Sequence, residues 1–93
     1  MNVKIVKMIN GEELIGNYDE VRTTISDPVV MIPVSKEKIA FQPWLPYAED
    51  KEYKLKESMI VIVANPSSTI MNEYNRIFGS GLVVPDNPSN IIM

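Results

Sequence analysis

The residue types that most often carry catalysis are scarce in this sequence. Its 93 residues include no cysteine and no histidine, which excludes thiolate nucleophiles, zinc–thiolate sites and imidazole acid–base catalysis. Carboxylates gather early, at Glu12, Glu13, Asp19 and Glu20. An acid–base pair of carboxylates must be held a few ångströms apart, whereas adjacent residues such as Glu12 and Glu13 point to opposite faces of a strand. We therefore expect a solvated hairpin here, and no enzyme, metal site or cofactor.

The aromatic segment from Phe41 to Tyr47 allows two interpretations. Trp44 and Tyr47 could stack on single-stranded nucleic acid, at about 1–3 kcal/mol per base. Alternatively, the loop is rigid and its aromatics pack against the domain or a neighbouring subunit. The lysines nearby are offset by carboxylates, so that no basic groove is expected and packing is favoured; these residues are Lys51, Lys54 and Lys56 against Glu49, Asp50, Glu52 and Glu57.

Composition is that of a single soluble globular domain spanning residues 1–93. Apolar residues make up 45% and charged residues 23%, and nine lysines and arginines against 12 aspartates and glutamates give a net charge of −3. This charge gives no general attraction to nucleic acid or anionic lipid. The longest apolar run, residues 59–64, is far shorter than the roughly 20 residues that span a bilayer, so no membrane association is expected.

The first 34 residues alternate in a pattern that predicts a strongly bent antiparallel meander. Asn10-Gly11 suits a tight turn with positive φ at both central positions, and Gly16 marks a bulge or a sharp bend in the return strand. Pro28 cannot donate to a ladder, so Asp27-Pro28 should break or kink the third strand. The strands predicted here are residues 3–8, 13–18 and 23–32, the last in two pieces.

The second half predicts two further strands and a helix. Residues 39–42 alternate, residues 48–51 form a polar turn, and residues 53–55 could continue the strand. Residues 59–64 are apolar on both faces, which predicts a fully buried strand.

Asn65 as N-cap and Pro66 at the first position begin a helix over residues 66–78, ended by Gly79. The apolar residues of this helix fall on one stripe that closes one end of the barrel or contacts a partner; they are Ile70, Met71, Tyr74, Ile77 and Phe78. Glu73 and Arg76, three residues apart, should form a weak surface pair. Residues 79–93 form a C-terminal extension.

The first hairpin resembles the Sm and Sm-like (LSm) family. An apolar strand, an Asn-Gly turn, a glycine five residues later and an apolar residue two further on match its first motif, at Gly11, Gly16 and Tyr18. Residues 55–62 lie where the second motif should be, so the resemblance covers residues 3–64. It implies a five-stranded, strongly bent antiparallel open barrel, here with a C-terminal helix, although the family usually carries its helix before the strands. The whole pattern is similar to short Sm-like proteins of tailed phages that infect marine cyanobacteria.

The resemblance implies a homo-oligomeric ring in which the fourth strand of one subunit pairs with the fifth strand of the next. Residues 39–42 would then face residues 59–64, with Ile39, Phe41, Ile60 and Ile62 at the interface. It also implies binding of uridine-rich single-stranded RNA, for which Lys56, Asp19 and Arg22 are the candidate residues.

Several positions depart from the family pattern. Lys56 replaces an arginine, Glu57 a glycine and Met59 an asparagine, and the base-stacking asparagine of the first motif has no counterpart. Lysine lacks the planar fork that stacks on a base, so Lys56 and Glu57 either contact RNA or solvate a surface turn.

Two functions therefore stay open: an Sm-like ring with non-canonical RNA binding, and an oligomeric scaffold or adaptor for a viral or host protein. The N-terminal segment reaches Glu12 too soon to hold the apolar core of a signal peptide. We expect a cytoplasmic location, in the host cytoplasm if the chain is phage-encoded.

Overall fold

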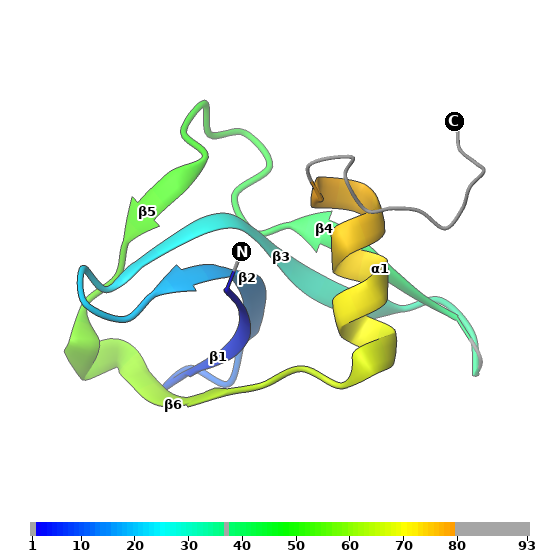
Figure 1. The fold of residues 1–93 in the computed structure, drawn as a ribbon, viewed down its shortest axis with the longest axis horizontal. Helices are drawn as coiled ribbons and strands as arrows, with labels where there is room; N and C mark the ends of the chain where they lie inside the picture. Colours follow the sequence, from blue (N-terminus) through cyan, green and yellow to red (C-terminus); the bar gives the residue numbers. More distant parts are fainter. Residues whose placement is uncertain (1, 37, 80–93) are drawn as a thin grey trace.

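A computed structural model of the chain describes residues 2–36 and 38–79 (Figure 1). Within these residues it is mainly β, an open antiparallel sheet with one C-terminal α-helix, as predicted. Most of the extension predicted at residues 79–93 lies outside the described residues. The elements are β1 (Val3–Met8), β2 (Glu13–Asp19), β3 (Thr24–Pro33), β4 (Ile39–Pro43), β5 (Glu52–Lys54), the 3₁₀ turn η1 (Glu57–Met59), β6 (Ile60–Ala64) and α1 (Ser68–Phe78).

The sheet has the strand order β4-β3-β2-β1-β6, and β5 also pairs with β3. β4 lies along residues 29–33 of β3 and β5 along residues 24–26. The two short strands therefore share one edge of β3, separated by the loop of residues 44–51. This division explains why the sheet has six strands where five were predicted.

The turn between β1 and β2 is longer than the sequence predicts. The N–H of Gly11 donates to the carbonyl of Met8 at 2.9 Å, and the N–H of Met8 donates to the carbonyl of Glu12 at 2.8 Å. Gly11 has φ +94°, whereas Asn10 is not among the described residues with positive φ. This is the three-residue loop that ends in a left-handed glycine. The prediction of positive φ at both positions was wrong, because only the residue without a Cβ takes it.

The meander is irregular where it was predicted to be, but the bulge lies in another strand. The register of β2 against β3 shifts between Ile15 and Asn17, where the single residue Gly16 lies opposite two residues of β3, Asp27 and Pro28. The extra residue is therefore in β3, and not in the return strand in which Gly16 was predicted to mark a bulge or a sharp bend. β3 continues through Asp27 and Pro28 but bends there, since Asp27 has φ +49°. Beyond this bend β3 changes its outer partner from β5 to β4.

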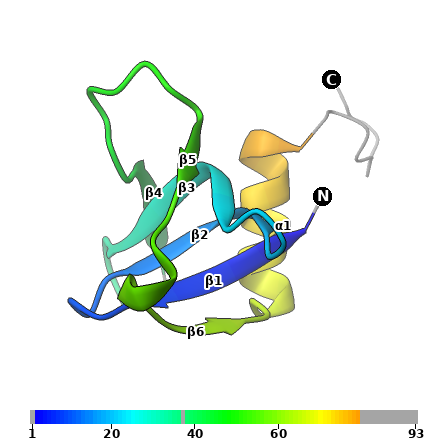
Figure 2. The same cartoon turned by 90° about the vertical axis from the view of Figure 1, so that its left-hand side faces the viewer.

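Two buried clusters hold the sheet. The inner core, on the concave side, consists of Val6, Met8, Leu14, Tyr18, Ile25 and Leu55. The helix-side core joins the opposite face of the sheet to α1 and consists of Val3, Ile15, Val29 and Tyr74, with Phe41, Ile70, Met71 and Phe78 packed around them. Figures 1 and 2 show α1 standing against this face. Tyr74 is the largest fully buried side chain in the described residues.

β6 is not the fully buried strand that its composition predicts. It pairs only with β1 and lies at the open edge of the sheet. Val61 is 61% exposed, Ile62 57% and Val63 37%. The helix covers the sheet further along, over β1 to β4, so both faces of β6 remain largely open in a single copy.

The helix begins two residues later than predicted. Ser67 is the N-cap and its Oγ accepts the N–H of Ile70 at 3.3 Å. Asn65, the predicted cap, instead accepts a hydrogen bond from the Lys4 ammonium through its side chain. Gly79 ends the helix as predicted. Ile77 was predicted on the core stripe, but it is 45% exposed and lies at the margin of that stripe, outside the helix-side core.

The pair predicted between Glu73 and Arg76 is confirmed. The Arg76 Nε donates to a Glu73 carboxylate oxygen at 3.2 Å, and this hydrogen bond lowers the pKa of Glu73. Both side chains are partly exposed, so the pair contributes little to stability.

The buried tyrosines make stability sensitive to alkali. Burial raises the pKa of Tyr74 well above its usual value, and the Asp27 carboxylate adds to this rise. Unfolded chains therefore lose the phenol proton from about pH 10 upward, while the folded chain retains it, and the free energy of unfolding falls with rising pH. In denaturant titrations between about pH 8 and 11 we expect Tyr74→Phe to flatten this fall. An unchanged slope in the variant would contradict the assignment to Tyr74.

Candidate nucleic-acid interface

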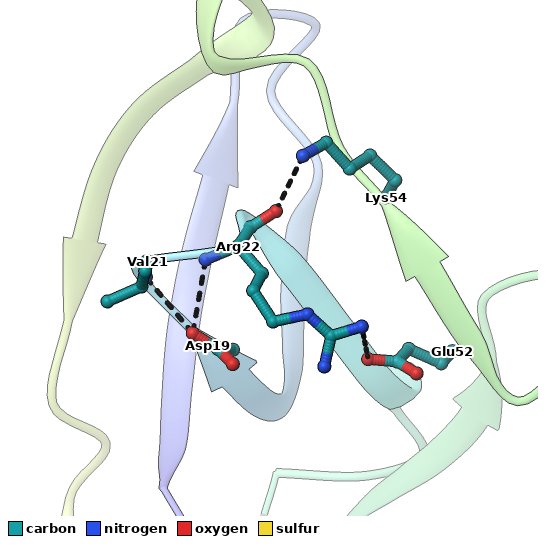
Figure 3. Close-up of polar contacts among 5 residues, drawn as sticks. All are labelled: Asp19, Val21, Arg22, Glu52 and Lys54. Atoms are coloured by element: carbon teal, nitrogen blue, oxygen red, sulfur yellow. Dashed lines mark hydrogen bonds and ion pairs between the residues drawn. The ribbon is translucent and has the colours of Figure 1, made fainter.

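Two segments that carry the candidate RNA-binding residues lie side by side at one end of the sheet. They are the turn of residues 19–23, which begins at the last residue of β2 and leads to β3, and residues 54–58, which begin at the last residue of β5. The Nζ of Lys54 donates to the carbonyl of Arg22 at 2.9 Å (Figure 3), and the N–H of Leu55 donates to the carbonyl of Thr23 at 2.8 Å. The pairing of β5 with β3 produces this contact. The fold thus brings the segments of Asp19, Arg22 and Lys56 together.

Asp19 fixes the conformation of the turn. Its Oδ1 accepts the N–H of Val21 at 3.0 Å and that of Arg22 at 3.2 Å (Figure 3). An aspartate that bonds to the backbone two and three residues later forms an Asx turn. This oxygen is therefore already occupied and is not free to read a base. Sequence reasoning placed Asp19 near RNA but missed this local role.

The two candidate cations differ in their surroundings. The Nη2 of Arg22 lies 3.8 Å from the Glu52 carboxylate, and the Arg22 side chain is 65% exposed. A loose, exposed pair of this kind contributes little, so a phosphate could compete for the guanidinium. Lys56 is exposed, and its ammonium makes no hydrogen bond or ion pair within the described residues.

Acidic side chains outnumber basic ones at this end of the molecule. Burial raises the pKa of Tyr18, and the carboxylates of Glu20, Glu57 and Asp19 raise it further. These three acids therefore converge on one site. Together with Glu52 they outnumber the cations of the two segments, which are Arg22, Lys54 and Lys56. A phosphate bound here would be repelled by the neighbouring carboxylates.

The aromatic segment is divided between packing and exposure. Trp44 packs against the inner core and meets Tyr53 edge-on, with ring centroids 6.0 Å apart. Its indole N–H donates to a Glu12 carboxylate oxygen at 3.2 Å. Trp44 therefore has a structural role, as the packing interpretation predicts, whereas Tyr47 is 100% exposed.

The predicted interface residues lie on the two open edges of the sheet. Ile39 on β4 is 41% exposed and Ile62 on β6 57% exposed. Phe41 and Ile60 are half-buried, against the helix-side core and the inner core respectively. Each edge thus has one side chain free to contact another molecule and one that belongs to its own domain.

Two other kinds of feature are absent from the described part of the chain. Residues 2–36 and 38–79 contain no group of three acidic side chains placed to hold a metal ion. No helix in that part is long and apolar enough to cross a membrane.

The family of the chain is shown by comparison with protein-family models. No curated protein matches the chain significantly. A family model described as a family of unknown function, DUF6561, matches residues 1–79, which include every element of the fold. The chain therefore belongs to the DUF6561 family.

Proposed function

We propose that this protein is the subunit of an Sm-like homo-oligomeric ring that binds single-stranded RNA at its rim. β4 of one copy pairs with β6 of the next copy. The turn of residues 19–23 and residues 54–58 then line the rim once per subunit, with Lys56 and Arg22 directed to phosphates.

The exposed apolar edge strand β6 carries this proposal. An edge strand leaves unpaired backbone N–H and C=O groups, and monomeric proteins protect such edges with charges, prolines or covering elements. β6 reads Ile-Val-Ile-Val-Ala, without charge or proline, and three of its side chains are at least 37% exposed. A strand of this composition is an aggregation hazard when left unpaired. A specific partner strand would remove the hazard.

The strand order supports a closed assembly. β4 and β6 are the two ends of the sheet order, so the pairing surfaces are different patches on opposite edges. Contacts between unlike patches continue from copy to copy and form a ring when the rotation closes. A ring would also multiply the small contribution of one Lys56 per subunit.

The charge distribution favours a second candidate, an oligomeric scaffold or adaptor for another protein. The four carboxylates near the two segments outnumber their three cations, and Oδ1 of Asp19 is occupied by its own turn. In this alternative the ring forms in the same way but the rim does not bind RNA.

Ile62→Lys is expected to convert the oligomer to a monomer. The new ammonium would have to be desolvated between paired strands, whereas in a single copy the Ile62 side chain is 57% exposed and its replacement should cost little. Light scattering at micromolar concentration gives the mass. Ile77→Lys is the matched control, since Ile77 is similarly exposed but lies on α1. A monomeric wild-type protein, or dissociation by both substitutions, would contradict pairing through β6.

Lys56→Ala is expected to weaken binding of oligouridine and to flatten its salt dependence by about one unit of logarithmic slope for each phosphate that is no longer neutralised. Glu57→Gly removes a repelling charge and is expected to tighten binding. Fluorescence polarisation across a salt series measures both effects. Lys36→Ala, which removes the same charge from the exposed turn before β4, should leave binding unchanged. Unchanged affinity in the Lys56 and Glu57 variants, with the ring intact, would favour the adaptor.

A further inference from the structure

A cavity of about 220 Å³ lies beneath the loop of residues 44–51, which rises from the sheet edge between β4 and β5 (Figures 1 and 2). The loop forms one wall. The bend of β3 forms another, and Phe78 at the end of α1 contributes a third. The residues that line this cavity include neither the two segments of the proposed RNA-binding rim, residues 19–23 and 54–58, nor the exposed side chains of β6.

The loop is held in place at its base. The N–H of Trp44 donates to the carbonyl of Pro28 at 3.0 Å, and the N–H of Asp27 donates to the carbonyl of Lys51 at 2.7 Å. The indole of Trp44 is fixed by its bond to Glu12. Pro46 restricts the backbone within the loop. The cavity is therefore preformed, and a ligand would not have to order the loop on binding.

The floor of the cavity is fixed from two sides. Asp27, at the bend of β3, has the left-handed φ of +49°. The Tyr74 hydroxyl donates to the carbonyl of Asp27 at 2.9 Å and to that of Ser26 at 3.2 Å. The buried helix residue and the loop thus hold the backbone of Asp27 between them, and Asp27 is one of the residues that line the cavity.

The walls combine apolar surface with negative charge. Pro28, Leu45, Pro46 and Phe78 supply the apolar part. Three acidic residues, Asp27, Glu49 and Asp50, are among the residues that line the same space, and Lys51 is its only lysine. None of these carboxylates forms an ion pair with a residue of the described chain. An anion would be repelled here, and a neutral apolar ligand would strip water from carboxylates without replacing its hydrogen bonds.

A long cationic side chain satisfies both parts of the wall. Its aliphatic stem can lie on apolar surface while the charged head meets carboxylates. Arginine fits better than lysine, because a guanidinium is less strongly hydrated, offers several donors in a fixed plane and stacks on aromatic rings. Tyr53 and Phe78 are the aromatic residues of the cavity wall. We propose that this cavity binds an arginine side chain presented by a protein partner.

Tyr47 indicates that the ligand comes on a protein surface. It lies in the rigid loop between the cavity residues Pro46 and Ala48, yet its side chain is 100% exposed. Tyrosine is among the residues that contribute most when buried at protein interfaces. An arginine alone would fill the cavity and leave Tyr47 in water, whereas a partner surface around the arginine would cover both.

The test uses a minimal peptide, acetyl-Gly-Arg-Gly-amide, against the full chain. Trp44 is the single tryptophan of the protein and contacts Tyr53 at the cavity wall, so its fluorescence measures binding. Amide chemical shifts are expected to move at residues 27, 45–51 and 78. The isosteric citrulline peptide, which lacks the charge, is expected to bind at least about tenfold more weakly.

A pair of double variants separates the site from general charge. Glu49→Gln with Asp50→Asn should weaken the arginine peptide about tenfold. Glu20→Gln with Glu57→Gln removes the same two charges at the other end of the sheet and should have little effect. Three results would overturn the proposal: equal binding of the citrulline peptide, equal weakening in the two double variants, or shifts mapping elsewhere. Dissociation of an oligomer by the peptide would also overturn it, because the occupant would then be a second copy. All four readouts are independent of RNA binding.

Discussion

Tyr74→Ala is expected to lower the free energy of unfolding by about 3–5 kcal/mol, the range for removing a fully buried aromatic side chain. Tyr74 is 1% exposed and joins α1 to the sheet through the helix-side core. Its ring lies against Phe78, with centroids 4.7 Å apart, and near Phe41 at 6.5 Å. A domain of this size has only about 5–15 kcal/mol of stability. We therefore expect detachment of α1 or global unfolding, measured by chemical denaturation.

Tyr74→Phe separates the hydroxyl from the ring. It keeps the packing but removes the donor shared by the carbonyls of Ser26 and Asp27. Leaving such acceptors without a donor costs about 1–3 kcal/mol. An alanine variant no less stable than the phenylalanine variant would show that the ring does not hold the helix to the sheet.

Gly16→Ala is expected to destabilise the domain by about 1–3 kcal/mol, as overpacking of a filled core does. A Cβ at this position would lie 2.7 Å from Cγ1 of Ile25 and 2.9 Å from the backbone oxygen of Ser26. Ile25 is fully buried in the inner core, and a backbone oxygen in a paired strand cannot rotate away. The pairing of β2 with β3 must open at Gly16 for the methyl group to fit. Thermal and denaturant unfolding measure the destabilisation.

Gly11→Ala is the matched control, because it adds the same methyl group in open space. Nothing lies within 4 Å of a Cβ at Gly11, and only the φ of +94° opposes the substitution. This strain costs about 1 kcal/mol. A destabilisation at Gly11 that equals or exceeds the one at Gly16 would mean that the sheet is not tightly packed at Gly16.

The meander could be predicted from local pattern, because alternation, Asn-Gly, Gly16 and Pro28 each act within a few residues. The exposure of β6 could not be predicted in this way. A strand that is apolar on both faces indicates that both faces are to be covered, but not whether the cover lies in the same chain. The N-cap was also ambiguous, since Asn65 and Ser67 are both good caps. In the structure Ser67 is the N-cap, and the Asn65 side chain instead contacts Lys4, 61 residues away.

The candidate site, too, could be predicted only in part. Arg22 and Lys56 could be selected as candidate RNA contacts because they are cations. Their proximity could not be predicted, because it depends on the pairing of β5 with β3 across a loop of eight residues, 44–51. The spacing of Asp19 before Val21 and Arg22 is a local pattern that could have indicated the Asx turn. The bond between Trp44 and Glu12 joins residues 32 positions apart, and no local pattern contains it.

Engineered disulfides can capture the proposed pairing of β4 with β6, since the chain has no cysteine of its own. Ile62 pairs with Lys7 and Ala64 with Ile5, on the helix-side face of the sheet, and Ile39 lies two residues from Phe41 on that face. Ile39→Cys is combined with Ile62→Cys or with Ala64→Cys, which sample two registers.

After oxidation, a denaturing gel without reductant should show for one double variant a ladder of covalent oligomers that ends at a single ring size. The single variants should give nothing beyond a dimer. Monomer bands alone in every double variant, with a monomeric mass by light scattering at the same concentration, would contradict assembly through these two edges.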